Sequence, residues 1–413
     1  MNNKKIKCLK CINCGVETAP KKNVYICSKC GSNLEVIMNY AEIKKRFKKS
    51  DLALNKKFDI WRYEPLLPVD NLKLVPPVQI GGVPLYDSVK LAKEIGIKKL
   101  YLKDEGKNPS ASFKDRAGAI ALLNALENKE KVICGASTGN AASSMACLAA
   151  TTGIKTIIFV PQTAPKAKIA QLLVFGATVI MVKGTYDEAF DLCVKASNEF
   201  GWYNRNTGYN PYTREGKKTC SFEIAEQLNW SVPDYVFVPV GDGNIISGIW
   251  KGWKDLYALG FIKQLPKIVG CQAQFSNSIQ KAFDGDGIIR AVSGKTIADS
   301  ISVSIPRDGL CAVKSIQESG GFAITVTDNE ILDAIKTVAR GASIFGEPAG
   351  VASIACLKKA VKTRKINNTE TVAALITGNG LKDVESAMKC VGKPFLIEPE
   401  LKALKKIIKS GVA

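Results

Sequence analysis

Short apolar runs alternate with helical segments along the chain after Tyr40, and this alternation constrains the fold more than any other feature. It is typical of an α/β fold with open, mostly parallel sheets. We interpret as strands the segments 100–103, 131–134, 155–160, 178–182, 235–240, 267–270, 321–326 and 371–376. Helical patterns cover 113–127, 139–153, 166–175, 186–201, 216–228, 244–259, 328–339 and 348–363.

The chain has 413 residues, more than one simple core holds, so two or three units are expected. No low-complexity linker divides the body, which indicates interwoven domains. No run of about 18 apolar residues is free of charge, so no membrane span is expected. Met1 to Lys10 are polar and basic, unlike a secretory signal, and a cytoplasmic location follows by default.

The formal net charge is +20, which could indicate a surface for nucleic acid or membranes. The lysines are scattered, however, and the densest basic runs are 44–49 and 402–409. We interpret the charge as solvated faces, so no nucleic-acid or membrane partner is expected. A positive field would still help to gather anionic small molecules.

The sequence contains no histidine and 13 cysteines. Without histidine, Ser-His-Asp triads, Cys-His pairs and His-ligated metal centres are excluded. Proton transfer must therefore use Lys, Asp, Glu, Cys, Tyr or a cofactor. The odd number of cysteines, in a chain without an export signal, indicates reduced thiols and a metal site rather than disulfides.

Two Cys-x-x-Cys-Gly knuckles near the N-terminus predict a structural zinc site. The expected ligands are Cys11, Cys14, Cys27 and Cys30, and the glycine after each pair permits the tight turn that faces two thiolates toward one ion. Cys8 offers an alternative pair with Cys11, and unliganded buried cysteines are the other interpretation. Four cysteine ligands leave no open position on zinc, so the site would not be catalytic.

A lysine in the first turn of a predicted helix is the first candidate for chemistry. Lys114 lies in the segment Asn-Pro-Ser-Ala-Ser-Phe-Lys-Asp-Arg, 108–116. A helix N-terminus disfavours an ammonium ion and lowers its pKa, and a lysine with a lowered pKa can form an imine. A surface lysine is the ordinary alternative.

Three loops rich in small residues follow predicted strands, at 135–142, 238–248 and 376–383. The first can form an anion nest, and the second has the strand–glycine–helix geometry of a phosphate site. The second lacks the Lys-Ser/Thr end of a P-loop, so a nucleotide triphosphate is not expected. Each loop alone could be a structural turn. Together with the lysine they predict a site for a phosphorylated aldehyde at the ligand edge of open sheets.

The motifs Ser-Phe-Lys-Asp-Arg (112–116), Ser-Thr-Gly-Asn-Ala-Ala (137–142), the glycine loop and Thr-Gly-Asn-Gly-Leu-Lys-Asp (377–383) resemble, in this order, those of the threonine synthases. These are fold type II pyridoxal-phosphate (PLP) enzymes of the tryptophan synthase β superfamily. The resemblance spans about residues 60–385 and includes 210–219 and 345–349. It implies an N-terminal zinc ribbon at 1–38, a large PLP domain formed by 39–130 and 212–413, and a small α/β domain at 131–211.

The resemblance also implies which residues bind the cofactor: Lys114, Asn140, Gly241, Asp242, Gly243, Asn244 and Thr377. Lys114 would bind PLP covalently and carry protons, as the catalytic residue. Asn140 would hydrogen-bond the PLP 3′ oxygen, residues 241–244 would wrap its phosphate, and the Thr377 hydroxyl would meet the pyridine nitrogen. Ser137 and Thr138 would line the substrate end.

The implied reaction converts O-phospho-L-homoserine and water to L-threonine and phosphate, in a homodimer. One alternative is β-replacement on phosphoserine, as in cysteate synthase, and another is β-elimination, as in threonine dehydratase. From a different class, the alternative is a non-catalytic zinc-ribbon protein that binds nucleic acid.

The sequence departs from the family pattern in two places. Thr213 stands where many threonine synthases have an arginine for the substrate phosphate, and Asn379 stands where many have histidine. The cations nearest to the motifs are Arg116, Arg214 and Lys217. We expect these to bind substrate, with Arg214 taking the place of the arginine missing at position 213.

Overall fold

The computed structural model describes residues 4–164 and 166–409, and its largest sheet has six strands in the order β12-β11-β10-β13-β5-β4. All neighbouring strands are parallel except β4, which pairs antiparallel with β5. The strands are β4 (Leu85–Asp87), β5 (Lys99–Asp104), β10 (Tyr235–Pro239), β11 (Lys267–Ala273), β12 (Phe322–Val326) and β13 (Thr371–Ile376). The predicted α/β class and mostly parallel sheets are therefore confirmed.

A second, fully parallel sheet has the order β8-β7-β6-β9. Its strands are β6 (Val132–Ala136), β7 (Lys155–Pro161), β8 (Thr178–Val182) and β9 (Tyr203–Asn204). They all lie within the residues 131–211 predicted as the small domain. The sequence analysis missed β9, because two paired residues leave no alternating pattern to detect.

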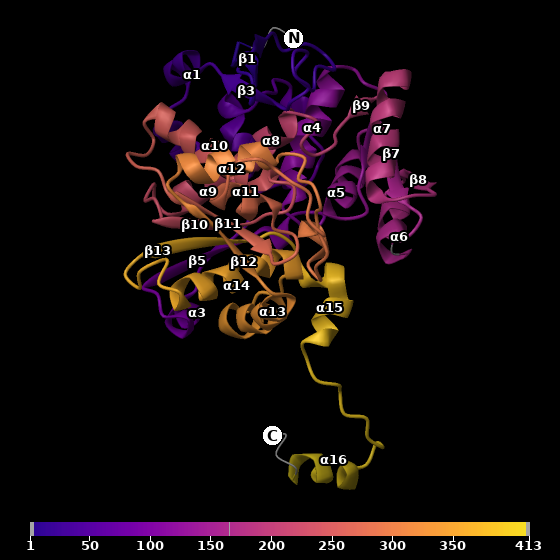
Figure 1. Ribbon diagram of the computed structural model, residues 1–413, viewed down its shortest axis with the longest axis vertical. Helices are drawn as coiled ribbons and strands as arrows, with labels where there is room; N and C mark the ends of the chain where they lie inside the picture. Colours follow the sequence, from indigo (N-terminus) through magenta and orange to yellow (C-terminus); the bar gives the residue numbers. More distant parts are fainter. Residues whose placement is uncertain (1–3, 165, 410–413) are drawn as a thin grey trace.

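Helices cover both faces of the six-stranded sheet (Figure 1). On one side lie α8 (Tyr212–Lys217), α9 (Thr219–Gln227), α10 (Asn244–Leu259), α11 (Ser278–Asp284) and α12 (Gly309–Glu318). On the other lie α3 (Val89–Ile95), α13 (Asp328–Ala342) and α14 (Pro348–Lys362). The helix expected to start at 216 begins earlier, at Tyr212, because Pro211 has φ −64° and presets a helical start.

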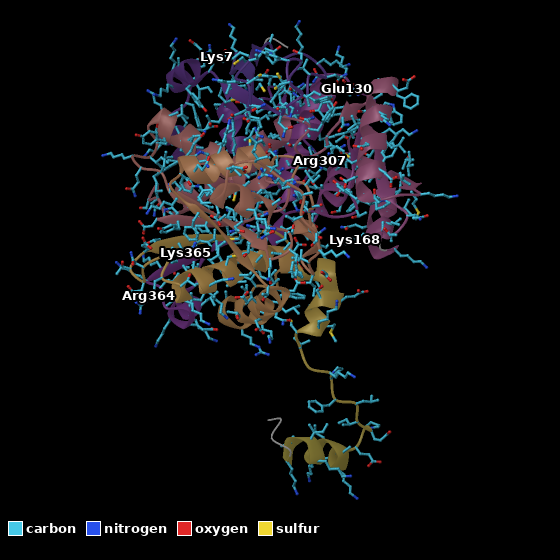
Figure 2. The ribbon with its side chains drawn as sticks, in the orientation of Figure 1. Lys7, Glu130, Lys168, Arg307, Arg364 and Lys365 are labelled. Atoms are coloured by element: carbon cyan, nitrogen blue, oxygen red, sulfur yellow. The ribbon has the colours of Figure 1, made fainter. Side chains whose placement is uncertain are left out.

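The smaller sheet is covered by α5 (Asn140–Ala149), α6 (Lys166–Val174) and α7 (Tyr186–Phe200), while α4 (Lys114–Glu127) packs between α5 and α8. Arg307, labelled in Figure 2, connects this part to the rest of the body. Its guanidinium pairs with Asp187 of α7 at 2.6 Å and lies 4.5 Å from the centre of the Phe190 ring.

The N-terminal segment forms a three-stranded antiparallel sheet with the order β2-β1-β3. Its strands are β1 (Ile6–Cys11), β2 (Glu17–Thr18) and β3 (Leu34–Met38), followed by α1 (Tyr40–Arg46) and α2 (Lys49–Leu54). Figure 1 shows this sheet at the end of the molecule opposite to α13. Its buried residues Leu9, Leu34 and Val36 belong to the main hydrophobic core, so the segment is packed onto the body.

The chain ends in α15 (Val384–Lys389) and α16 (Leu401–Ile407), and α16 lies away from the body in Figure 1. Short 3-10 turns complete the described chain: η1 (Ile60–Leu66), η2 (Leu72–Leu74), η3 (Glu105–Lys107), η4 (Asp299–Ile301) and η5 (Gly380–Asp383). Within 4–164 and 166–409, the helices are too short or too polar to cross a membrane.

A fully buried ion cluster ties β5, η3, α4 and α9 together. The Arg116 guanidinium pairs with Glu105 at 2.8 Å and with Glu223 at 2.7 Å, and the Lys103 amine pairs with Glu223 at 2.7 Å. Burial tends to raise the pKa of Glu223, but the charges of Arg116 and Lys103 outweigh it and lower that pKa to about 2. The cluster is therefore charged at neutral pH and has a structural role.

We predict that Glu223→Ala lowers the free energy of unfolding by about 3–5 kcal/mol, because it leaves two buried cations without their shared carboxylate. Asp286→Ala, which removes an exposed partner of Arg290, should cost at most about 1 kcal/mol. Denaturant unfolding followed by circular dichroism measures both values. Equal losses in the two variants would contradict the assigned role of the cluster.

The same cluster predicts how stability depends on pH. The pKa of Glu223 is lowered on folding, so its stabilising contribution is present above the unfolded pKa of about 4.3 and is lost as pH falls toward 2. We expect Glu223 to contribute about 3 kcal/mol to this acid-induced loss. The difference in unfolding free energy between the wild type and Glu223→Ala should therefore shrink as the pH falls from about 5 to about 2. A constant difference would contradict the account.

Candidate active site

The lysine loop and the threonine loop are joined by backbone hydrogen bonds. The N–H of Phe113, directly before α4, donates to the carbonyl oxygen of Thr377 at 2.9 Å, and Ser112 forms a bridge with Gly378. Thr377 directly follows β13. Lys114 is therefore the first residue of α4, as predicted, and is fixed at the carboxyl edge of the large sheet.

One cavity brings together all seven residues predicted to bind the cofactor: Lys114, Asn140, Gly241, Asp242, Gly243, Asn244 and Thr377. An adjoining cavity is lined by Ser137, Thr138 and Tyr186, and again by Lys114 and Asp242. The two predicted substrate hydroxyls thus lie beside the lysine. Lys114, Asn140 and Asp242 line both cavities, so the glycine-loop side and the serine–threonine side share the lysine.

The environment of Lys114 lowers the pKa of its amine. Burial is the main cause, the negative charge of Asp242 opposes it, and the positive charge of Arg205 adds to it. The prediction assigned the shift to the helix N-terminus, whereas burial and these neighbouring charges are its causes in the structure. A lowered pKa supplies the neutral amine that imine formation requires.

The glycine loop leads directly into α10, a helix of 16 residues whose N-terminus favours anions. Gly243 has φ +89°, and a Cβ there would lie 2.7 Å from the carbonyl oxygen of Asp308, so no other residue fits. The Asn244 amide donates to Asp308 at 2.7 Å, and the Lys217 amine donates to the Asn244 Oδ1. The loop therefore joins backbone donors to a buried cation.

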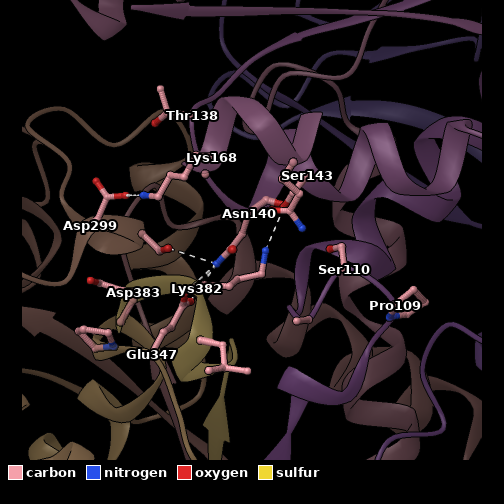
Figure 3. Close-up of a pocket in the computed structure, with 17 residues that line it drawn as sticks. Pro109, Ser110, Thr138, Asn140, Ser143, Lys168, Asp299, Glu347, Lys382 and Asp383 are labelled. Carbon is pink, nitrogen blue, oxygen red and sulfur yellow. Dashed lines mark hydrogen bonds and ion pairs between the residues drawn. The ribbon is translucent and has the colours of Figure 1, made fainter. Parts of the chain in front are cut away.

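Glu347 lines the cavity of the glycine loop and also a third cavity, which Figure 3 shows with Asn140 beside it. The Asn140 amide donates to Glu347 at 2.9 Å and to Ser300 at 3.2 Å, and burial raises the pKa of Glu347. The same close-up shows Lys382 donating to Ser143 at 3.1 Å and Lys168 paired with Asp299. Glu347 and Lys382 lie in motifs typical of the family, but only the fold shows that they line this cleft.

Two of the three cations expected to bind substrate lie elsewhere. Arg116 belongs to the buried cluster with Glu105 and Glu223, and Arg214 makes two 2.8 Å hydrogen bonds to the carboxylate of Asp308. Arg214 also donates to Ser247 at 3.1 Å. Because carboxylates already satisfy both guanidinium groups, the geometry does not support substrate binding by Arg116 or Arg214, and we assign them structural roles.

Lys217 lies beside the glycine loop, where its amine donates to Asn244. It is fully buried, burial lowers its pKa well below the ordinary value, and the charges of Lys114 and Arg205 lower it further. Sequence reasoning missed Arg205, which follows β9 and influences the pKa of both lysines. The sequence marked Arg205 only by its positive charge near the segment 210–219, because the short strand β9 before it was not recognised.

The four predicted zinc ligands lie together. The sulfur atoms of Cys11, Cys14, Cys27 and Cys30 are all within 4.8 Å of one another, with 3.5 Å between Cys11 and Cys30 and 3.6 Å between Cys14 and Cys27. Zinc–sulfur bonds of about 2.3 Å in a tetrahedron require sulfur–sulfur distances close to these. Cys8 is not part of this group.

Both knuckles turn as expected, with φ +73° at Gly15 and +69° at Gly31. The N–H groups of these glycines donate to the carbonyl oxygens of Cys11 and Cys27 at 3.1 and 2.9 Å. The turns bring the two cysteines of each pair to one side, and the four-sulfur donor set fits a structural zinc ion.

Comparison with known proteins gives one consistent family. Residues 77–378 match the pyridoxal-phosphate dependent enzyme family. The chain is 41% identical to a threonine synthase from Methanocaldococcus jannaschii, covering 97% of this chain and 99% of that protein. It is 38% identical to a threonine synthase from Methanosarcina acetivorans, covering 97% and 98%. Threonine deaminase isoform 2 from Solanum lycopersicum has a similar structure, with TM-score 0.66, 25% identity and coverage of 75% and 83%.

The environment of Arg214 predicts an effect on the cofactor site. Arg214→Ala leaves the buried Asp308 carboxylate, which holds Asn244, without its cation, at a cost of about 3–5 kcal/mol. We expect a lower unfolding temperature and weaker PLP binding, measured by thermal denaturation and by absorbance titration with PLP. A variant with normal stability and PLP affinity but reduced kcat/KM would restore Arg214 as a substrate ligand.

The cysteine group predicts about one tightly bound zinc ion per chain. Elemental analysis of protein purified without added metal should find this zinc, and Cys27→Ser combined with Cys30→Ser should abolish it. Cys8→Ser should keep it, because the Cys8 sulfur lies outside the group. Zinc retained in the double variant would show that the knuckles are not the site.

Proposed function

The chain belongs to the threonine synthases of the pyridoxal-phosphate dependent enzyme family, and we propose that it converts O-phospho-L-homoserine and water to L-threonine and phosphate. The observation that carries this proposal is the meeting of Lys114, the glycine loop and Thr377 in one cavity. The serine–threonine side adjoins it and offers room for a substrate.

The residues around this cavity fit PLP. The start of α10 offers backbone N–H groups to a phosphate, and the Lys217 amine has no carboxylate partner within 4–164 and 166–409. Thr377 offers a hydroxyl at the end of β13, and Lys114 offers an amine with a lowered pKa. We propose that Lys217 and residues 241–244 hold the cofactor phosphate, Lys114 its aldehyde carbon and Thr377 its ring nitrogen.

When bound, PLP supplies an electron sink for the bonds around the substrate Cα. Lys114 is the one amine that both cavities share, so it is placed to take a proton from Cα and return protons to the substrate carbons. No histidine exists to share this work. Ser137 and Thr138, at the start of α5, are placed to orient the substrate.

Lys114→Ala should abolish both the covalent link to PLP and the activity. The wild type should show a visible absorbance band that disappears on reduction with borohydride, with the label on the peptide that contains Lys114. The variant should bind PLP only reversibly. A covalent, reducible chromophore that persists in Lys114→Ala would contradict this assignment.

The substrate is tested by direct assay. The holoenzyme should release threonine and phosphate in equal amounts from O-phosphohomoserine, and it should form no product from phosphoserine with sulfite. The reverse outcome would favour a β-replacement enzyme, and ammonia release from threonine would favour the dehydratase alternative. A protein without a PLP chromophore that binds nucleic acid would favour the non-catalytic alternative.

Zinc in the four-cysteine group, a homodimeric assembly and a cytoplasmic location complete the proposal. The four sulfur atoms support the zinc ion. The assembly follows from the family resemblance and is tested by measuring the molar mass of the holoenzyme in solution.

A further inference from the structure

Most buried cations among the described residues have a carboxylate partner. Arg62, Lys103, Arg116, Arg214, Lys218 and Lys251 are buried and form salt bridges. Within 4–164 and 166–409, the buried cations without a carboxylate within 4.0 Å are Arg205 and Lys217. The charge of Arg205 lowers the pKa of Lys114 and of Lys217. An unpaired buried charge is costly, so both cations indicate places for anions.

The backbone of Arg205 pairs with β6 and places the side chain against the end of that strand. Its N–H donates to the carbonyl oxygen of Cys134 at 2.9 Å, which continues the pairing of β9 with β6. The side chain then crosses Gly135, where a Cβ would lie 3.0 Å from the Arg205 Cδ. Ala136 and Tyr186, beyond this crossing, line the cavity of Ser137 and Thr138.

Hydrogen-bond donors at this point have no acceptor among the described residues. Nε and Nη2 of Arg205 are buried without a partner, and so is Nδ2 of the next residue, Asn206. Arg205 is only 3% exposed, and burial lowers its pKa to about 10. The Asn206 Oδ1 accepts a hydrogen bond from the Ala136 N–H at 2.7 Å, and the backbone N–H of Asn206 donates to the Asn204 Oδ1 at 2.9 Å. These bonds hold the Asn206 amide in place.

We propose that Arg205 and Asn206 bind the phosphate group of the substrate, in the role that the sequence assigned to Arg214. This inference rests on the proposed function and extends it to a specific subsite. A guanidinium presents paired donors that match phosphate oxygens, and its charge offsets the charge that the leaving phosphate gains.

The two unpaired cations contact different parts of the chain near Lys114. Lys217 is hydrogen-bonded to Asn244 of the glycine loop, the side that fits the cofactor phosphate. Arg205 lies against Gly135, at the strand end that leads to Ser137 and Thr138. Thr213, at the position of the missing arginine, faces Asn244 at 3.4 Å and has no charge to offer. Two cations for two phosphates is the arrangement that this geometry supports.

The test uses holoenzyme variants Arg205→Gln and Arg205→Lys, with Arg290→Gln as the control for loss of one positive charge at an exposed site. Inorganic phosphate is the probe, and its affinity is measured by calorimetry and as inhibition of the wild-type reaction. PLP content, PLP affinity and thermal stability are measured on the same samples. Steady-state kinetics with O-phosphohomoserine gives kcat and KM.

Arg205→Gln should weaken phosphate binding about 10- to 100-fold, as expected for loss of charged hydrogen bonds. It should lower kcat/KM by about 10²- to 10³-fold, the effect of removing one charge-stabilising donor. PLP affinity should not change. Arg205→Lys, which keeps the charge without the paired donors, should recover part of the loss, and Arg290→Gln should match the wild type.

Stability separates this role from a structural one. Removing an unpaired buried charge should leave the cofactor-free protein as stable as the wild type or more stable. Removing an arginine with a structural role should instead lower the stability of the protein. Three results would each overturn the inference, provided that the wild type is active. The first is an unchanged phosphate affinity in Arg205→Gln, and the second is a loss of PLP binding in that variant. The third is a lower unfolding temperature in both Arg205 variants. A wild type that makes no threonine would instead refute the proposed function.

Discussion

Four groups donate hydrogen bonds to the buried carboxylate of Asp308, and the geometry of the glycine loop depends on them. Arg214 binds it with two 2.8 Å hydrogen bonds, Asn244 donates at 2.7 Å, and Ser247 donates at 2.9 Å. Asn33 of the N-terminal segment donates at 3.0 Å. Because the Asp308 N–H also donates to the carbonyl oxygen of Asp242 at 2.8 Å, one residue fixes the glycine loop from several directions.

This convergence gives the N-terminal segment a function in the site. Asn33 lies three residues after Cys30. The turn that contains Cys30 therefore positions the Asn33 amide, which donates to Asp308. Tyr25 reaches the small sheet, where its hydroxyl accepts the N–H of Asn204 at 3.3 Å, next to Arg205. The N-terminal segment therefore supports the cavity from outside, and a zinc ion bound by the four cysteines would hold this segment in shape.

Much of the fold could be predicted from the sequence, because strand and helix patterns repeat over most of the body. The strands near 100, 132 and 371 and the loops after them were found by these patterns, and Lys114 was correctly placed at a helix start. The cysteine spacing predicted the four cysteines whose sulfur atoms lie together.

The partners of buried charges could not be predicted in this way. Arg116 and Arg214 lie within motifs typical of the family. Their guanidinium groups nevertheless pair with Glu105, Glu223 and Asp308, and no sequence pattern marked these carboxylates as their partners. Arg205 follows a strand of two residues, too short to recognise. Its lack of a partner becomes visible only when the whole chain is folded around it.

We propose that two buried cations, Lys217 and Arg205, bind two different phosphate groups near Lys114. A crystal structure of the holoenzyme with inorganic phosphate tests this most directly. The account predicts the PLP phosphate at the start of α10 beside Lys217, and the free phosphate within hydrogen-bond distance of Arg205 and Asn206. A free phosphate bound at Arg214, with Arg205 still unpartnered, would contradict it.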